Sequence, residues 1–176
     1  ALGQGEQLVD ALQQGESGAI VLDRTPFYAE SGGQAGDRGI LRAGNTEFRV
    51  NDTQYLANKV IAHFGEVVSG ELQAGNEVEA EVDRRARSEC AANHSVTHLT
   101  HAALKIVLGE HVQQKGSQVM AERMRFDFSH FEPVTPDEIR RIEDMVNEQI
   151  RANLPVKTAV MALEEAKARG AAALFG

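Results

Sequence analysis

Short stretches of alternating apolar and polar residues dominate the first half of the chain. A period of two is typical of strands that bury one face. Such stretches occupy residues 39–42, 46–50, 59–64 and 77–82, with glycine- or asparagine-containing segments between them, and residues 19–22 are a compact apolar run of strand length. This spacing predicts a small antiparallel β-barrel or sandwich, and we assign residues 1–83 to a β-barrel domain. Residues 1–17, which are rich in Gln and Gly, are expected to form a lead-in with one short helix at most.

The apolar period changes from two to 3.6 at Asp83. Asp83 is suited to cap the start of a helix, and Gly109 is suited to follow its end. The sequence therefore predicts one long helix over residues 84–108. Alternation then returns, which predicts two further strands over residues 112–119 and 123–128.

A second long helix is expected to start at Thr135. Thr135, Pro136 and Glu138 have the order of a capping box, with Pro at the first helical position and Glu at the third. Apolar residues then recur at helical spacing and predict a buried stripe. The stripe consists of Ile139, Ile142, Met145, Val146 and Ile150.

The last part of the chain is predicted to form a strand over residues 155–162 and a short helix over residues 163–169, which Gly170 stops. Residues 171–176 are an apolar run, which favours a segment cut from a larger protein. Together the patterns predict an α+β fold. In it, a small antiparallel β-barrel is followed by an α/β core over residues 84–176, with an antiparallel sheet and two main helices.

Composition narrows the class of protein. The chain has 42% hydrophobic residues and no apolar run near the length of a membrane span, so we expect no membrane partner. A single cysteine excludes an internal disulfide and favours a cytoplasmic setting. The net charge of −8 argues against a protein that coats nucleic acid through its phosphates, so any RNA contact must be local.

Residues 93–103 hold three of the six histidines of the chain, His94, His98 and His101. Residues three and four apart lie on the same face of a helix, so these imidazoles form one ridge. A His-x-x-x-His pair on a helix recurs in zinc sites, whereas a lone helical histidine is more often an ordinary surface or core residue. The ridge is therefore a candidate metal site.

Neighbouring residues limit how such a site is completed. A zinc protease would need Glu directly after the first histidine, and Ser95 stands there. Cys90 lies eight residues before His98, a rise of about 12 Å, whereas zinc ligands lie about 2.0 to 2.3 Å from one ion. The two cannot share a metal. Two histidines do not close a tetrahedral site, so His101, another segment or a segment outside this chain must complete it.

A glycine-rich stretch over residues 30–39 contains four glycines. Glycine is required where the backbone has a positive φ or where a Cβ would block a close approach. The stretch lacks the Gly-Lys-Ser/Thr ending of a phosphate-binding P-loop. Composition alone favours a connection between two strands, with a close backbone approach as the alternative.

Five blocks, in this order, resemble the editing region of bacterial alanyl-tRNA synthetase. They are residues 25–34 (TPFYAESGGQ), 93–104 (NHSVTHLTHAAL), 114–117 (QKGS), 125–129 (RFDFS) and 170–176 (GAAALFG). The resemblance implies a domain that hydrolyses the ester of mischarged seryl- or glycyl-tRNA(Ala), within an enzyme that ligates alanine to tRNA(Ala) using ATP. It also makes residues 84–176 the editing core.

The resemblance implies a zinc ion held by His94 and His98, with His101 outside the coordination shell. A Cys and a second His of a later Cys-x-x-x-His block would supply the other two ligands, and in the family that block lies beyond the position of Gly176. On this basis the chain is expected to hold at most half of the metal site and to lack a complete metal site of its own.

Further roles are implied for residues that match the family motifs. Thr97 resembles the residue that reads the serine hydroxyl, and Gln114 resembles a polar residue lining the editing pocket. Read without the family, Thr97 is a helix hydroxyl bonded to its own i−4 carbonyl, and Gln114 is a solvent-facing strand residue. Gly32, Gly33 and Gln34 resemble a substrate-site loop that leans toward the pocket, which favours the close backbone approach.

Three alternatives remain open at this stage. One is a free-standing AlaX-type deacylase, another is the editing domain of threonyl-tRNA synthetase, and the third is a non-catalytic RNA-contacting module. Under the favoured interpretation the partners are tRNA(Ala) and the other domains of the parent synthetase.

Overall fold

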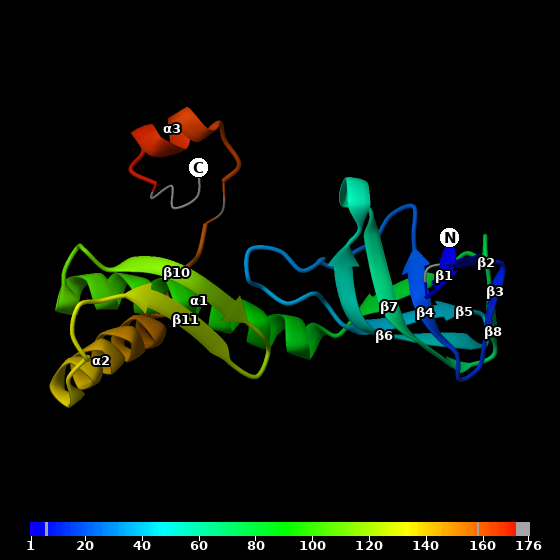
Figure 1. Cartoon of the computed structure of the whole chain (residues 1–176), viewed down its shortest axis with the longest axis horizontal. Coiled ribbons are helices and arrows are strands. Elements are labelled where there is room, and N and C mark those ends of the chain that lie inside the picture. Colours follow the sequence, from blue (N-terminus) through cyan, green and yellow to red (C-terminus); the bar gives the residue numbers. More distant parts are fainter. Residues whose placement is uncertain (6, 158, 172–176) are drawn as a thin grey trace. The chain divides into compact units, whose positions relative to one another are not determined.

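A computed structural model describes residues 1–5, 7–157 and 159–171 (Figure 1). The chain divides into two compact units, the first made of Ala1–Thr97 with Gly116–Phe126, the second of His98–Lys115 with the described residues after Phe126. Antiparallel strands make up most of the first unit and helices most of the second, so the predicted α+β class is confirmed. The strands are β1 (Leu2–Gln4), β2 (Gln7–Val9), β3 (Ala11–Gln13), β4 (Ser17–Val21), β5 (Gly39–Ala43), β6 (Thr46–Tyr55), β7 (Ile61–Ser69), β8 (Glu71–Gln73), β9 (Glu79–Val82), β10 (Gln113–Val119) and β11 (Met124–Ser129). The helices are η1 (Ala57–Lys59), α1 (Arg84–Leu108), α2 (Pro136–Ala152) and α3 (Leu163–Ala168).

A seven-stranded antiparallel sheet forms the body of the first unit, in the order β2-β1-β4-β7-β6-β5-β9. Strands β3 and β8 form a separate antiparallel pair. The prediction of a closed barrel is wrong for the described residues, because β2 and β9 are the two ends of the sheet and do not pair with each other. The apolar run over residues 19–22 corresponds to β4, and the alternating stretches correspond to β5, β6, β7 and β9.

The first seventeen residues contain strands rather than the expected lead-in. β1 pairs with both β2 and β4, and Leu2 lies opposite Ile20 in the sheet. Leu12 of β3 has no exposed surface and pairs with Leu72 of β8. These strands are only three residues long, so alternation within them is too short to be recognised, and their buried leucines join a core that includes Phe48 and Val67.

His63 is fully buried in β7, in the same unit. Its Nδ1–H donates to the carbonyl of Ile20 at 2.8 Å, so Nε2 accepts the hydroxyl hydrogen of Thr25 at 2.7 Å. The ring of Phe27 packs edge-on against the imidazole, with centroids 5.1 Å apart. Burial lowers the pKa of His63, although the bond to Ile20 opposes this effect.

A stability loss at mildly acidic pH follows from the lowered pKa of His63. The unfolded chain takes up a proton near its ordinary pKa of about 6.5 while the folded chain does not, so acidification favours unfolding. We expect the unfolding free energy to fall below about pH 6.5 by up to about 1.4 kcal/mol per pH unit from this residue. Urea unfolding at pH 7.5 and 5.5 measures the slope, and His63→Gln should reduce it. An equal pH dependence of the unfolding free energy in the two proteins would contradict its attribution to His63.

Helix α1 has the predicted bounds and caps. The carboxylate of Asp83 accepts the backbone N–H groups of Arg85 and Ala86, both at 3.0 Å. Gly109 follows the helix with a φ of 117°. Among the described residues no helix has both the length and the apolar character needed to cross a membrane.

Helix α2 also begins as predicted. Thr135 accepts from the backbone N–H of Glu138 at 3.3 Å, and the Glu138 carboxylate accepts from the N–H of Thr135 at 2.9 Å. The predicted buried stripe is only partly correct. Val146 is buried and Ile142 and Met145 are half-buried, but Ile139 and Ile150, at the two ends of the stripe, are 45% and 48% exposed.

The segment before α3 differs from the prediction. Residues 155–157 and 159–162 form no strand, and Val156 and Val160 are 83% and 99% exposed. Alternation produces a strand only where a neighbouring strand supplies hydrogen bonds, and no described strand pairs here. Helix α3 and its end at Gly170, where φ is 84°, are confirmed. Of the predicted terminal apolar run, residues 172–176 lie outside the described residues.

Candidate functional site

The glycine-rich stretch makes a tight turn within the first unit. Gly32 and Gly33 have φ values of 59° and 84°, in the left-handed region that favours glycine. The turn is closed by two backbone hydrogen bonds between Ser31 and Gln34, of 3.2 and 3.0 Å. The backbone of Gln34 is therefore fixed within the turn itself.

The same turn lies against the end of β10. The N–H of Val119 donates to the carbonyl of Gly33 at 2.8 Å, and the N–H of Ala35 donates to the carbonyl of Val119 at 2.9 Å. A Cβ on Gly33 would lie 2.4 Å from the carbonyl oxygen of Ser117, whereas one on Gly32 would meet nothing within 4 Å. The close backbone approach considered for this stretch is present, and in the turn itself Gly33 is the residue that requires it. Gly36 and Gly39 make similar approaches, since a Cβ on either would lie 2.1 Å from a carbonyl oxygen, of Thr53 and Glu81 respectively.

This turn presents the side chain of Gln34 to His94 of α1. The amide oxygen of Gln34 and Nδ1 of His94 are 2.6 Å apart. An amide oxygen only accepts, so Nδ1 carries the proton and donates it. In a neutral imidazole with that proton, the lone pair is on Nε2, the atom then suited to bind a metal.

Helix α1 is anchored beside His94 to the segment that follows β10. The side-chain amide of Asn93 donates to the carbonyls of Met120 and Ala121 at 2.8 and 3.0 Å. Cys90, one turn earlier, is buried with its sulfur 3.8 Å from the carbonyl of Val119. Burial raises the pKa of the Cys90 thiol, which disfavours the thiolate form that a metal binds.

An ion pair that the sequence did not indicate ties the start of α1 to the end of the glycine stretch. The Arg87 guanidinium donates to the carboxylate of Asp37 and, at 2.7 Å, to the carbonyl of Pro26. The backbone N–H of Tyr28 donates to the same carboxylate at 2.6 Å. The hydrogen bond to Asp37 raises the pKa of Arg87. No motif links these residues in the sequence, because fifty positions separate Arg87 from Asp37.

Thr97 is buried on α1, with 5% of its surface exposed. Its hydroxyl donates to the carbonyl of Asn93 at 2.9 Å, the i−4 bond that the helix alone would produce. The hydroxyl oxygen keeps its capacity to accept a hydrogen bond from another group.

The remaining candidate residues belong to the second unit. His98 is exposed on α1, and Gln114 is half-buried on β10. His101, also on α1, has its pKa lowered by burial and further by Lys105 and His98. The described residues include no group of three or more metal-binding side chains. His94 and His98 have the i, i+4 spacing that recurs in helical zinc-ligand pairs, and two imidazoles are part of a zinc donor set that other groups must complete.

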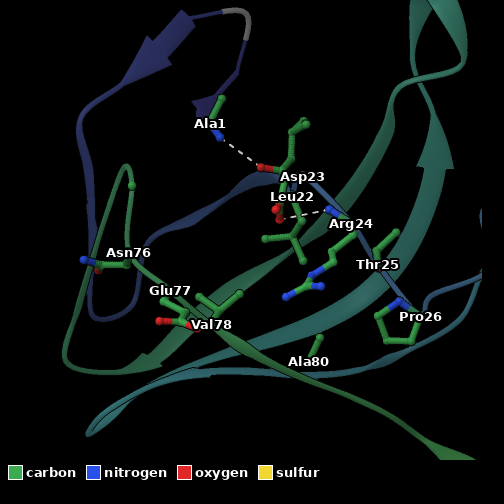
Figure 2. A pocket seen from close by; sticks show the side chains of 12 residues that line it. Ala1, Leu22, Asp23, Arg24, Thr25, Pro26, Asn76, Glu77, Val78 and Ala80 are labelled. Carbon is green, nitrogen blue, oxygen red and sulfur yellow. Dashed lines mark hydrogen bonds between the residues drawn. The ribbon is translucent and has the colours of Figure 1, made fainter.

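A cavity of about 770 Å³ lies elsewhere in the first unit (Figure 2). Its walls come from the segment after β4, including Asp23 and Arg24, and from the turn before β9, including Asn76 and Glu77. The ammonium group of Ala1 donates to the carbonyl of Val21 at 2.9 Å. None of the candidate site residues lines this cavity.

Comparison with known proteins identifies similar sequences along most of the chain. Residues 1–86 match the family described as tRNA synthetases class II (A). Over 168 residues, 96% of the chain, the sequence is 56% identical to an alanine–tRNA ligase of Idiomarina loihiensis. It is 55% identical, over the same length, to an alanine–tRNA ligase of Legionella pneumophila (strain Lens). The chain spans 19% of the length of each of these two relatives.

Proposed function

Because this chain belongs to the alanine–tRNA ligase family, we propose that it is the editing region of such an enzyme. The proposed reaction is hydrolysis of the ester that joins serine or glycine to tRNA(Ala). The whole enzyme would ligate alanine to tRNA(Ala) using ATP, and its other domains would be partners of this segment. The observation that carries the proposal is the His-x-x-x-His pair of α1 within a sequence 56% identical to an alanine–tRNA ligase.

The chemistry of amino-acid selection supports the need for this reaction. A pocket that accepts alanine excludes the smaller glycine poorly and discriminates weakly against the single hydroxyl that serine adds. A second site that hydrolyses the wrong products restores accuracy.

His94 and His98 would hold the zinc ion, with two ligands from outside this chain. When bound, zinc would supply a positive centre that orients the aminoacyl ester or a water molecule. The chain itself contributes the placement of the first ligand, since Gln34 accepts the Nδ1 proton of His94. Gln114 is proposed to line the substrate pocket, with Gly32 and Gly33 shaping the loop that carries Gln34.

Thr97 is proposed to read the serine hydroxyl. Its own proton is committed to the carbonyl of Asn93, so its oxygen is oriented to accept rather than to donate. A seryl ester offers a hydroxyl donor to this oxygen, and an alanyl ester offers none. The arrangement therefore favours serine at a buried position where an unmatched polar group is costly.

Metal removal tests the proposed function. The hydrolysis rate of seryl-tRNA(Ala) is measured for a full-length alanine–tRNA ligase that contains this chain, as purified, after chelation and after zinc is restored. We expect hydrolysis to be lost on chelation and to return with zinc. Absence of hydrolysis in all three samples would contradict the editing role, and full hydrolysis after verified metal removal would contradict the role of zinc.

Replacement of Thr97 tests selectivity. In the same full-length enzyme, Thr97→Val removes one hydrogen bond to the serine hydroxyl, so we expect single-turnover hydrolysis of seryl-tRNA(Ala) to fall about tenfold. Hydrolysis of glycyl-tRNA(Ala) should change by less than about twofold, because glycine has no hydroxyl. Ser95→Ala is a matched control, since the hydroxyl of Ser95 makes the same type of i−4 bond, to Ala91 at 3.1 Å, on the exposed face of the helix. Equal loss on both esters would contradict the proposed role of Thr97.

A further inference from the structure

We infer that Gln34 is a positioning residue that holds His94 in one tautomer and one orientation. The inference starts from the hydrogen bond of 2.6 Å between the Gln34 amide oxygen and His94 Nδ1. It rests on the proposed function in one respect, the role of His94 as a metal ligand. The position of the proton on the ring can be measured whether or not that role is correct.

The Gln34 side of this bond is held by backbone interactions. The backbone of Gln34 pairs with Ser31, and its two neighbours, Gly33 and Ala35, are both hydrogen-bonded to Val119. The approach to Ser117 requires glycine at position 33. Gln34 therefore has little freedom to move relative to the end of β10.

The His94 side is held by the same part of the chain. Asn93, the residue before His94, donates to Met120 and Ala121, which directly follow β10. Residues 117–121 thus fix both the loop that carries Gln34 and the turn of α1 that carries His94. A contact between residues sixty positions apart becomes rigid because both partners are attached to one short segment.

The chemical consequence concerns which ring nitrogen keeps its lone pair. A neutral histidine binds a metal through the nitrogen that lacks a proton, and the hydrogen bond made by the other nitrogen decides which one this is. Metal-bound histidines commonly donate their second N–H to an oxygen of the protein, and loss of such a partner typically weakens metal binding about 10- to 100-fold. Gln34 supplies this oxygen to His94.

Nuclear magnetic resonance of this chain, without metal, tests the inference first. Two-bond proton–nitrogen correlation spectra at pH 8.5, where imidazoles are neutral, distinguish a protonated from an unprotonated ring nitrogen. We expect His94 to carry its proton on Nδ1 in the unmodified chain. Gln34→Leu should shift His94 toward a mixture of tautomers, whereas Gln34→Glu, which keeps an oxygen acceptor, should retain the Nδ1 proton. A proton on Nε2 of His94 in the unmodified chain would overturn the inference.

Zinc affinity provides a second readout in a full-length alanine–tRNA ligase containing this chain. Competition with a chromophoric chelator should show zinc binding weakened about 10- to 100-fold by Gln34→Leu, and by less than about threefold by Gln34→Glu. Gln73→Leu, at an exposed position of β8, is the matched control and should leave the affinity unchanged. Unchanged affinity in folded Gln34→Leu would overturn the positioning role. If the unmodified enzyme bound no zinc, the proposed metal role would fail, and the spectra would still decide whether Gln34 sets the tautomer.

Discussion

Replacing both His94 and His98 by alanine in a full-length alanine–tRNA ligase that contains this chain is expected to abolish hydrolysis of seryl-tRNA(Ala). Loss of the metal removes several kcal/mol of transition-state stabilisation, so the rate should fall at least about 100-fold. Activation of alanine with ATP should be unchanged, because no residue of this segment is proposed to take part in that reaction. Single-turnover deacylation and amino-acid activation assays on the same preparation measure the two activities.

A single alanine substitution of His111 is the control for the double variant. His111 is an exposed histidine of the second unit, and its ring stacks on those of His130 and Phe131, with centroids 5.1 and 4.6 Å away. His111→Ala should retain seryl-tRNA(Ala) hydrolysis. Undiminished hydrolysis in the His94→Ala and His98→Ala double variant would show that these histidines do not bind a metal ion needed for the reaction.

The second large effect is expected from Gly33→Ala. Alanine at a φ of 84° costs about 1 to 2 kcal/mol, and its Cβ would lie 2.4 Å from the carbonyl oxygen of Ser117. The loop must therefore move away from β10, and the two hydrogen bonds to Val119 are lost. We expect the free energy of unfolding of this chain to fall by about 4 kcal/mol in total.

Gly32→Ala separates backbone strain from the close approach. Gly32 also has a positive φ, of 59°, but a Cβ there would meet nothing within 4 Å. Only the strain should remain, about 1 kcal/mol. Urea unfolding of both variants gives the two costs, and equal costs would contradict the contact between the loop and β10. In the full-length enzyme, Gly33→Ala should also reduce seryl-tRNA(Ala) hydrolysis more than Gly32→Ala does, because it displaces Gln34 from His94.

Local signals accounted for the elements that were predicted correctly. The caps at Asp83 and Thr135 act within one turn of their own helices, so a short stretch of sequence was enough to place α1 and α2. The strands missed at the start of the chain are held by distant partners, as Leu12 is by Leu72 of β8. The strand expected over residues 155–162 had the local pattern but lacks a pairing neighbour among the described strands.

In the candidate site, too, features set by local sequence were predicted and contacts between distant residues were not. The helical period was enough to place His94, His98 and His101 on one ridge, and the family resemblance narrowed the expected ligands to His94 and His98. The contact of His94 with Gln34 and the ion pair of Arg87 with Asp37 join residues sixty and fifty positions apart. No periodicity links such pairs, because they are created by how the glycine stretch packs beside α1. The family resemblance placed Gln34 in a substrate-site loop. The structure adds its hydrogen-bond partner, His94.

The proposed function is tested most directly by comparing two esters of the same tRNA. Single-turnover hydrolysis of seryl-tRNA(Ala) and alanyl-tRNA(Ala) is measured with an unmodified, zinc-loaded, full-length alanine–tRNA ligase that contains this chain. We expect the seryl ester to be hydrolysed about tenfold faster than the alanyl ester, because only serine supplies a hydroxyl for the hydrogen bond that Thr97 is proposed to accept. Equal rates for the two esters, or no hydrolysis of the seryl ester, would contradict the proposed editing function.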